Sequence, residues 1–396
     1  MNTMRKNTAG TILWKIEEAR RIHMTFVITM DKPIDGEALA KAAEDAMEVW
    51  PLFRCGAELK DGVPYYTPND RPIVLTKGCE IHAPGSVALN GHMFHLGYQD
   101  DKIYLMRSHV ITDGQGLLRF MKTLLYAYVC HAYGQLPVTD AFRWKGESYP
   151  DDYADLWELD YSGIAPLPDE PVPQPVYVLP ENTNHGGRND ITAIFSAPKD
   201  EFLAFVKKQQ TATSTSILGI FARALYRIRD VKLPIVARIT ANARDALGIP
   251  HAMPNCSMGA HFALEAADVS DANFAETMAA MKKSLKRQIS SASMRGQARG
   301  LLDRGICYPP IHTTCSIAYL GHIDFDFCGS HVKDFTLYEG EQHKINLFEM
   351  DEKFHFILHL GEKTAEYANA MVDSLRDFGV PAKMQECVVV PEEIYD

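Results

Sequence analysis

The stretch Arg107-Ser-His-Val-Ile-Thr-Asp-Gly114 joins a predicted strand, Lys102 to His109, to a predicted helix, Gly116 to Tyr133. Side chains alternate across a strand, whereas Leu and Met recur at helical spacing in the second segment. The stretch therefore puts His109 at the end of a strand and Asp113 in the turn that follows it. A histidine in that place can project into a cleft while its backbone stays fixed. Its pKa lies close enough to neutrality to exchange protons with a hydroxyl, an amine or a thiol.

Asp113 and Gly114 suit the turn that follows the histidine. The aspartate can hold the turn through backbone amides or through an arginine, and the glycine permits a conformation with positive φ. Taken alone, a His-x-x-x-Asp-Gly string also arises by chance and in core packing. The string therefore indicates a catalytic histidine only together with its surroundings.

The segments before this stretch predict strands and helices in alternation. Phe26-Val-Ile-Thr-Met30 predicts a strand, and Glu37 to Val49 predicts a helix because Ala, Leu and Met recur at helical spacing. Trp50-Pro51 ends that helix, since proline disfavours the α conformation in the residue before it. Met93 to Tyr98 and Lys102 to His109 predict the two strands of a hairpin.

The later part of the chain repeats this alternation. Its predicted strands are 191–196, 234–240, 315–319, a segment near 336, and 354–360, and its predicted helices are 199–208, 215–228, 274–289 and 364–378. Pro166 to Pro180 contains prolines too dense for a helix or a central strand, so it predicts an extended linker. We therefore expect an α/β (α+β) protein with an N-terminal lobe at 1–165, a proline-rich crossover at 166–189 and a C-terminal lobe at 190–396.

The composition is that of an ordinary globular protein, with 396 residues of which 46% are apolar and 23% charged. A net charge of −11 disfavours a general nucleic-acid binder, which needs clustered Lys and Arg. The one basic cluster, Lys282-Lys283 with Lys286-Arg287, predicts a solvated helix face, with an anion-binding patch as the alternative. No apolar run is long enough for a membrane span, and Met1 to Gly10 lacks the apolar core of a secretory signal, so we expect a cytoplasmic protein.

Several standard sites are absent from the sequence. It contains no phosphate-binding Gly-x-x-x-x-Gly-Lys loop, no dinucleotide-binding Gly-x-Gly-x-x-Gly, no Gly-x-Ser-x-Gly elbow and no His-Glu-x-x-His. The pairs His92 with His95 and His355 with His359 fall in strand-like segments, where their offsets do not bring two ligands together. The eight cysteines are dispersed without regular spacing, so neither a disulfide framework nor a metal site is expected.

The stretch from Arg107 to Gly114 resembles the His-His-x-x-x-Asp-Gly signature of the CoA-dependent acyltransferase superfamily. This superfamily includes chloramphenicol acetyltransferase, nonribosomal peptide condensation domains, alcohol acetyltransferases and polyketide-associated acyltransferases. Other segments are similar to the family in order and spacing: 33–39 with 50–54, Tyr149-Pro-Asp-Asp-Tyr-Ala-Asp-Leu-Trp157, Ala241-Asn-Ala-Arg244 with Asn255-Cys256, and Ser316-Ile-Ala-Tyr-Leu-Gly321 as the late strand that crosses between lobes. The resemblance thus spans most of the chain.

Two positions depart from the family pattern. Ser108 replaces the first histidine of the signature, while the second histidine, which is the base in the family, is present as His109. The serine therefore bears on local packing more than on catalysis. Asp324-Phe-Asp-Phe-Cys-Gly329 matches the Asp-Phe-Gly-Trp-Gly stretch of the plant members only loosely, and we carry no role over to it.

The resemblance implies two chloramphenicol-acetyltransferase-like lobes, each a mixed sheet flanked by helices, with a tunnel between them. His109 would take the proton from an acceptor hydroxyl or amine as it attacks a thioester, without an acyl-enzyme. Asp113 would form an ion pair with an arginine of the second lobe, for which we choose Arg244. Gly114 would let the chain approach the thioester, and Ser316 is a candidate oxyanion donor, with a buried strand serine as the alternative. Gly116 is expected only to start the helix.

The implied cosubstrate is acyl-CoA or another phosphopantetheine thioester, with no permanently bound cofactor and no metal. The expected partners are a small-molecule acyl donor and acceptor, and the acyl donor can alternatively be held on a carrier protein, as in condensation domains. A binding protein that keeps the fold without turnover is the rival outside enzymes, and the presence of His109 argues against it. About 400 residues in two lobes suffice for a site within one chain, so we expect a monomer.

Overall fold

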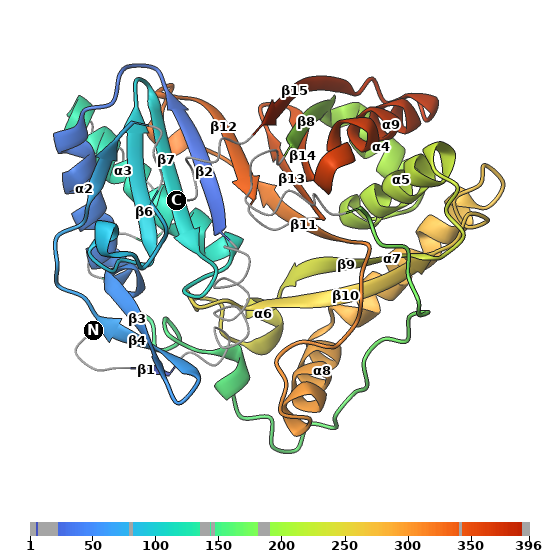
Figure 1. Cartoon of the computed structure of the whole chain (residues 1–396), viewed down its shortest axis with the longest axis horizontal. Coiled ribbons are helices and arrows are strands. Elements are labelled where there is room, and N and C mark those ends of the chain that lie inside the picture. The colour runs from blue at the N-terminus through green and yellow to red at the C-terminus, as the bar shows by residue number, and fades with distance from the viewer. Residues whose placement is uncertain are drawn as a thin grey trace.

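The computed structural model of the chain describes residues 5–6, 23–78, 82–134, 143, 147–180, 191–339 and 343–389. Two large β-sheets organise these residues, and both are flanked by helices (Figure 1). The α/β class predicted from the sequence is confirmed. Within the described residues, no helix combines the length and the apolar character needed to cross a membrane.

The first sheet has five strands and contains the predicted hairpin. Its order is β12 (Val332–Glu339), β2 (His23–Met30), β7 (Lys102–Ser108), β6 (Phe94–Gln99) and β5 (Leu75–Lys77). The helices α2 (Gly36–Val49) and α3 (Gly114–Tyr133) cover one face (Figure 1). Apolar residues recur at helical spacing on both helices and alternate on the strands, so they meet in one core. The strand β7 lies at the centre of this sheet, which fixes the backbone that leads to His109.

A small sheet adjoins the first one. It contains β1 (Arg5–Lys6), β4 (Val63–Pro68) and β3 (Cys55–Lys60) in that order, with β4 antiparallel to both neighbours. The short helix η1 (Pro51–Arg54) leads from α2 into β3, and η2 (Val87–Leu89) precedes β6. The turn at Asp61-Gly62 between β3 and β4 has positive φ at both residues, as the tight hairpin requires.

The second sheet has seven strands. Their order is β10 (Ser257–Leu264), β9 (Ile235–Asn242), β11 (Cys315–His322), β13 (Lys344–Met350), β14 (Lys353–His359), β8 (Ile191–Pro198) and β15 (Lys383–Val389). The pairs of β11 with β9 and with β13 are parallel and the others are antiparallel, so the sheet is mixed. One core joins it to α4 (Lys199–Lys208), α5 (Thr213–Ile228) and α9 (Thr364–Asp377), with η5 (Gly361–Lys363) before α9.

Further helices flank the connections of this sheet. The helices α7 (Phe274–Gln288) and α8 (Ser291–Asp303) follow β10, and the short α6 (Arg244–Leu247) follows β9. A third apolar cluster lies among α6, α8 and η3 (Leu156–Glu158). The exposed Lys282, Lys283 and Lys286 lie on one solvated side of α7. The single-turn helix η4 (Asp326–Cys328) lies between β11 and β12.

One strand from the second half of the chain lies in the first large sheet. The predicted crossing strand, 316–321, lies in β11 and stays in the seven-stranded sheet, so that prediction is wrong. The strand that crosses is β12, which pairs antiparallel with β2 of the first sheet. Its Phe335 packs against Phe348 of β13, with ring centroids 5.1 Å apart. An alternating apolar pattern gives a strand a buried face but does not choose its sheet.

The proline-rich segment has neither helix nor strand from 166 to 180, and it runs around α8 (Figure 1). It is fixed to the second half of the chain, because the Leu167 amide donates to the Gly296 carbonyl at 2.8 Å and the Tyr177 amide to the Pro234 carbonyl at 2.9 Å. A Cβ atom at Gly300 would lie 2.3 Å from the Leu167 carbonyl oxygen, so α8 needs a glycine at that contact. The rest of the predicted linker, 181–189, lies outside the described residues.

Candidate functional site

His109 is the first residue after β7, and it is half-buried. The preceding residues of β7 pair with β2 on one side and β6 on the other, so the backbone that enters the turn is held on both edges. The turn itself is supported by Ser108, which is fully buried and whose hydroxyl accepts a hydrogen bond from the Val110 amide at 3.1 Å. The serine that replaces the first signature histidine thus satisfies a buried backbone donor.

Asp113 caps the N-terminus of α3. Its carboxylate accepts hydrogen bonds from the Gly116 amide at 3.0 Å and, across the chain, from the Cys256 amide at 2.9 Å. The Ser257 hydroxyl lies 3.4 Å from the same carboxylate. The aspartate therefore joins the start of α3 to the segment that precedes β10.

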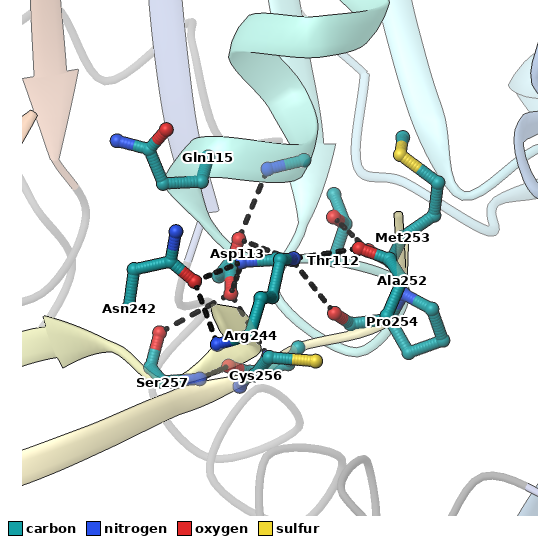
Figure 2. A network of polar contacts seen from close by, with 12 residues as sticks. Thr112, Asp113, Gln115, Asn242, Arg244, Ala252, Met253, Pro254, Cys256 and Ser257 are labelled. Carbon is teal, nitrogen blue, oxygen red and sulfur yellow. Dashed lines mark hydrogen bonds and ion pairs between the residues drawn. The ribbon is translucent and has the colours of Figure 1, made fainter. Parts of the chain in front are cut away.

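The ion pair expected between Asp113 and Arg244 is present and is bidentate (Figure 2). Nη1 of Arg244 lies 2.9 Å from Oδ2, and Nη2 lies 3.0 Å from Oδ1. Arg244 has no exposed surface and Asp113 is 3% exposed. A buried ion pair loses the hydration of both charges, so it is stable only where further hydrogen bonds replace that hydration.

Arg244 makes those further hydrogen bonds. Its Nε donates to the Ala252 carbonyl at 2.6 Å, its Nη2 to the Pro254 carbonyl at 2.9 Å and its Nη1 to the Asn242 side-chain oxygen at 3.0 Å (Figure 2). Together with the two bonds to Asp113, all five N–H donors of the guanidinium have an acceptor. The arginine has no donor left for a substrate.

The charges of this pair set the pKa of its members. Burial alone would raise the pKa of Asp113, but the Arg244 charge and the hydrogen bonds to the carboxylate lower it to about 2. Burial would likewise lower the pKa of Arg244, and the Asp113 charge raises it instead. Burial raises the pKa of the neighbouring Cys256 thiol to about 12. Asp113 therefore stays ionised near neutral pH and is suited to hold structure, not to move protons.

The start of α3 is also held by side chains outside the ion pair. The Thr112 hydroxyl donates to the Met253 carbonyl at 2.6 Å, and the Arg119 guanidinium donates to the Pro250 carbonyl at 2.7 Å. The Gln115 side chain donates to the Leu320 carbonyl of β11 at 3.0 Å. The turn after His109 thus contacts both the 250–256 loop and β11.

The two glycines of this turn differ from expectation. Gly114 is the first residue of α3 and its φ is not positive, so the turn does not use the conformational freedom that this glycine permits. A Cβ at Gly114 would lie 3.1 Å from the end of the Leu320 side chain and 3.8 Å from the end of the Met24 side chain. A Cβ at Gly116 would lie 1.8 Å from the Thr112 hydroxyl and 2.9 Å from the Met253 carbonyl. Gly116, expected only to start the helix, is the position where the two halves of the chain leave no room for a side chain.

Ser316 lies on β11, where it is half-buried and pairs in register with Arg238 of β9 and Lys344 of β13. On the same strand it is four residues from Leu320, which is about 13 Å at the usual rise of a strand. The described contacts bring Asp113, Gly114 and Arg244 together and do not join Ser316 to them. The hydroxyl faces the same side of β11 as Leu320.

A pocket that sequence reasoning missed lies beside this network. It is small and is formed by residues of β9, β10, α8, η3, the proline-rich segment and the 307–311 loop. Ser257 belongs to both, since it lines the pocket and contacts Asp113. Trp157, at the end of the segment that begins at Tyr149, is another lining residue. No local motif marks the pocket, because its residues come from segments far apart in the sequence.

Within the described part of the chain, no group of three or more His, Cys, Asp or Glu side chains could hold a metal ion. The tested histidines have structural contacts. Nε2 of His92 lies 2.9 Å from the Arg71 carbonyl, and Nε2 of His95 lies 2.7 Å from the Thr76 hydroxyl. Burial and the nearby His82 charge lower the pKa of His95 to about 4, which suits a neutral buried ring. His355 stacks on Phe348.

Comparison with known proteins gives matches only at the level of structure. No protein-family model matches the sequence. No curated protein matches it either. Among solved structures, polyketide synthase associated protein 5 from Mycobacterium tuberculosis is similar over 94% of this chain and 97% of its own, with a TM-score of 0.67 and 12% identity.

Two further structures have the same fold. The epimerization domain from the third module of tyrocidine synthetase B covers 95% of this chain and 96% of its own, with a TM-score of 0.64 and 14% identity. F. graminearum TRI101, solved with coenzyme A and T-2 mycotoxin, covers 93% of this chain and 97% of its own, with a TM-score of 0.61 and 12% identity. The chain therefore has the two-lobed fold of these three structures, as the resemblance implied.

Proposed function

We propose that the chain is an acyltransferase that moves an acyl group from a CoA thioester to an alcohol or an amine, with His109 as the general base. One observation carries this proposal: a half-buried histidine directly follows the central strand of a sheet, and a buried, fully hydrogen-bonded ion pair fixes the turn after it. A general base needs a fixed backbone and access to solvent or substrate, and His109 has both.

In the proposed reaction the neutral His109 imidazole takes the proton of the acceptor hydroxyl or amine. The acceptor oxygen or nitrogen then forms a bond to the thioester carbonyl carbon, and the carbonyl oxygen becomes an oxyanion. When that oxyanion collapses, the carbon–sulfur bond breaks, and the CoA thiolate takes the proton back from the imidazolium. General base catalysis of this kind contributes typically about 10²- to 10⁴-fold. No acyl-enzyme is needed.

Asp113 and Arg244 act as positioning residues in this proposal. Their charges are neutralised by each other, and every guanidinium donor is occupied within the protein. The pair fixes the end of the turn that begins at His109. Gly114 and Gly116 let this turn lie against β11 and the 250–256 loop.

Ser316 remains the proposed oxyanion donor, because it lies on the same strand as Leu320, whose carbonyl accepts a hydrogen bond from Gln115 at the start of α3. Removal of an oxyanion donor lowers kcat by about 10²- to 10³-fold, whereas removal of a serine hydroxyl that only packs in a strand does not. The variant Ser316→Ala therefore decides between the two roles by its effect on kcat at saturating substrate.

The choice of CoA as donor is supported by the shared fold with TRI101, whose structure holds coenzyme A and T-2 mycotoxin. The same fold occurs in the condensation domain of the monacolin K polyketide synthase MokA, at 11% identity. A thioester carried on a protein is therefore the alternative donor. A monomer remains our expectation, since the site is built from one chain.

The experiment is an assay of thiol release with acyl-CoAs of increasing chain length and mixed alcohols and amines. Release that requires both an acceptor and His109 supports the proposal, and His109→Ala is expected to lower the rate by about 10²-fold or more. The matched control is His322→Ala, because His322 is 58% exposed on β11 and pairs with Glu349. Equal activity of wild type and His109→Ala would refute the assigned base.

A further inference from the structure

Asn242 is the last residue of β9, and its side chain contacts the buried Asp113–Arg244 network. Its Oδ1 accepts hydrogen bonds from the backbone amide of Arg244 at 3.2 Å and from Nη1 of Arg244 at 3.0 Å. Because an arginine can only donate, the amide oxygen must face it and the NH2 group must point away from it (Figure 2). The orientation of the Asn242 side chain is therefore fixed by a residue that is itself fully buried.

The NH2 group of Asn242 has two donors, for which the residues that the structure describes supply no acceptor. The side chain is exposed, although Arg244, to which it is bonded, and Asp113 are buried. His109 and Gly114, on either side of the turn, also keep solvent access. The network is therefore closed at Arg244 and open at Asn242.

Two contacts place Asn242 beside the turn that follows His109. Nη1 of Arg244, which donates to Asn242, also donates to Asp113 at 2.9 Å. Ser257 pairs with Asn242 in register, and its hydroxyl lies 3.4 Å from the same carboxylate. Both neighbours of Asn242 thus contact Asp113, the fourth residue after His109. A donor in this place can bind the part of a substrate that reacts near the turn.

The charge of Arg244 strengthens the donors of Asn242. A cation that donates to the oxygen of an amide draws electron density from the amide nitrogen, and hydrogen bonds in series strengthen one another. The guanidinium itself has no donor left, because all of its N–H groups are bonded within the protein. The two N–H groups of Asn242 therefore carry the effect of the buried charge to the exposed side of the network.

The chemistry of these donors favours one kind of ligand group. Two N–H groups fit an oxygen that only accepts hydrogen bonds, such as a carbonyl oxygen. An acyl-CoA has carbonyl oxygens in its thioester and in the two amides of its pantetheine arm. The attacking hydroxyl or amine of the acceptor is a poorer partner, because an N–H bonded to its lone pair would occupy the electrons that form the new bond.

We propose that Asn242 is a substrate-binding residue, whose NH2 group donates a hydrogen bond to a carbonyl oxygen of the acyl-CoA beside the His109 turn. This inference rests on the proposed function, because it takes an acyl thioester as the substrate. The oxygen belongs to the thioester or to the pantetheine arm. Ser316 cannot share the thioester oxygen with Asn242, because Arg238, its partner in register, lies four residues before Asn242, about 13 Å along β9.

Two variants of Asn242 separate this role from a structural one. Asn242→Asp keeps an oxygen for both hydrogen bonds from Arg244 but loses the NH2 group, so the denaturant midpoint of unfolding should stay at the wild-type value. Asn242→Ala removes the donors without adding a negative charge. The matched control is Asn369→Asp, because Asn369 is exposed on α9, where its Nδ2 donates to the Ala365 carbonyl at 2.9 Å. It should bind and react as wild type does.

Binding is measured first, by calorimetry with two CoA analogues that do not react. In acetonyl-dethio-CoA a CH2 group replaces the sulfur, so a ketone stands in place of the thioester carbonyl. Ethyl-CoA has the same pantetheine arm and no carbonyl beside the sulfur. If Asn242 bonds the thioester oxygen, both variants should bind the ketone about tenfold more weakly and ethyl-CoA as wild type does. If it bonds the pantetheine arm, both analogues should bind about tenfold more weakly.

Turnover tests the same assignment with the acyl-CoA that releases thiol fastest. A donor to the thioester oxyanion should lower kcat about 10²-fold in Asn242→Ala, while Ser316→Ala leaves kcat unchanged. A donor to the pantetheine arm should instead raise KM for the acyl-CoA about tenfold at unchanged kcat.

The inference is overturned if Asn242→Ala binds both analogues as wild type does, if only the KM for the acceptor rises, or if wild type binds neither analogue at millimolar concentration. Thiol release that Asn242→Ala leaves unchanged contradicts the inference and leaves the proposed function intact. If wild type binds the analogues but releases no thiol with any acceptor, the proposed function fails, whereas analogue binding still decides the role of Asn242.

Discussion

Two arginines near each other in the chain, Arg238 within β9 and Arg244 just after it, have opposite surroundings. Arg244 is fully buried, faces Asp113 and has an acceptor for each N–H. Arg238 is half-buried, lies over an aromatic ring and has no described carboxylate partner. The difference shows that one short stretch of chain, from β9 into α6, carries both a charge that is fully compensated within the protein and a charge that has no described counter-charge.

The largest expected effect is on the free energy of unfolding of Arg244→Met. Because the substitution leaves the Asp113 carboxylate buried without its counter-charge, unfolding should need about 3 to 5 kcal/mol less free energy. Arg238→Met should lose no more than about 1 kcal/mol, the usual size of a partly exposed cation–π contact. Denaturant unfolding of both variants measures this, and equal losses would break the comparison.

A second test uses the glycine beside each arginine site. Gly116→Ala forces a methyl group against Thr112 and a backbone carbonyl that cannot move, so it should destabilise the protein by about 3 kcal/mol. Gly259→Ala meets only the Arg238 side chain, which can shift, and should destabilise it by less than about 1 kcal/mol. Thermal unfolding measures both changes. A larger loss from Gly259→Ala would show that the Arg238 side chain cannot shift aside.

The dependence of stability on pH sharpens the same contrast. The pKa of Asp113 is lowered to about 2 in the folded protein, so the unfolded chain binds this proton first as pH falls. The stabilisation is present above about pH 4 and should be lost, by about 2 kcal/mol, as pH falls toward 2. Arg238→Met should lose the same stability between pH 4 and pH 2 as wild type does. Arg244→Met should not show this loss, because the Arg244 charge lowers the pKa of Asp113. Denaturant midpoints between pH 2 and pH 5 test the difference.

The smallest expected effect is that of Ser257→Ala, the residue common to both regions. Its hydroxyl lies 3.4 Å from the Asp113 carboxylate, which keeps two stronger backbone hydrogen bonds without it. Unfolding free energy should fall by less than about 1 kcal/mol. The same denaturant assay checks this, and a loss as large as that of Arg244→Met would show that the network depends on the serine.

The sequence predicted the parts of the site that are close together in the chain. The hairpin ending at His109, the aspartate that holds the turn through a backbone amide and the helix that follows are local, and their spacing appears in the order of residues. Arg244 could be chosen only through resemblance to a family, because an ion pair across 131 positions leaves no periodic trace.

Other elements were missed for definable reasons. The 55–68 hairpin contains two prolines and lies in a small sheet, so its alternation of apolar and polar residues is weak. One face of the strand β10 carries Gly259 and His261, which is not a typical strand pattern. In the structure this face lies against Arg238, a contact that the sequence does not reveal. The pocket itself depends on how six separate segments pack, and no local rule encodes that arrangement.

The position of β12 in the first sheet has a consequence for folding during synthesis. Residues 332–339 form the outer strand of a sheet whose other strands lie within the first 110 residues. Until β12 has been synthesised, β2 is an edge strand of the sheet with one side unpaired. Unpaired edge strands can pair with strands of other chains. Asp31 likewise lacks its side-chain partner His331, which lies 300 positions later in the chain, until that residue has been synthesised. The five-stranded sheet of the first lobe is therefore complete only after residue 339 has been synthesised.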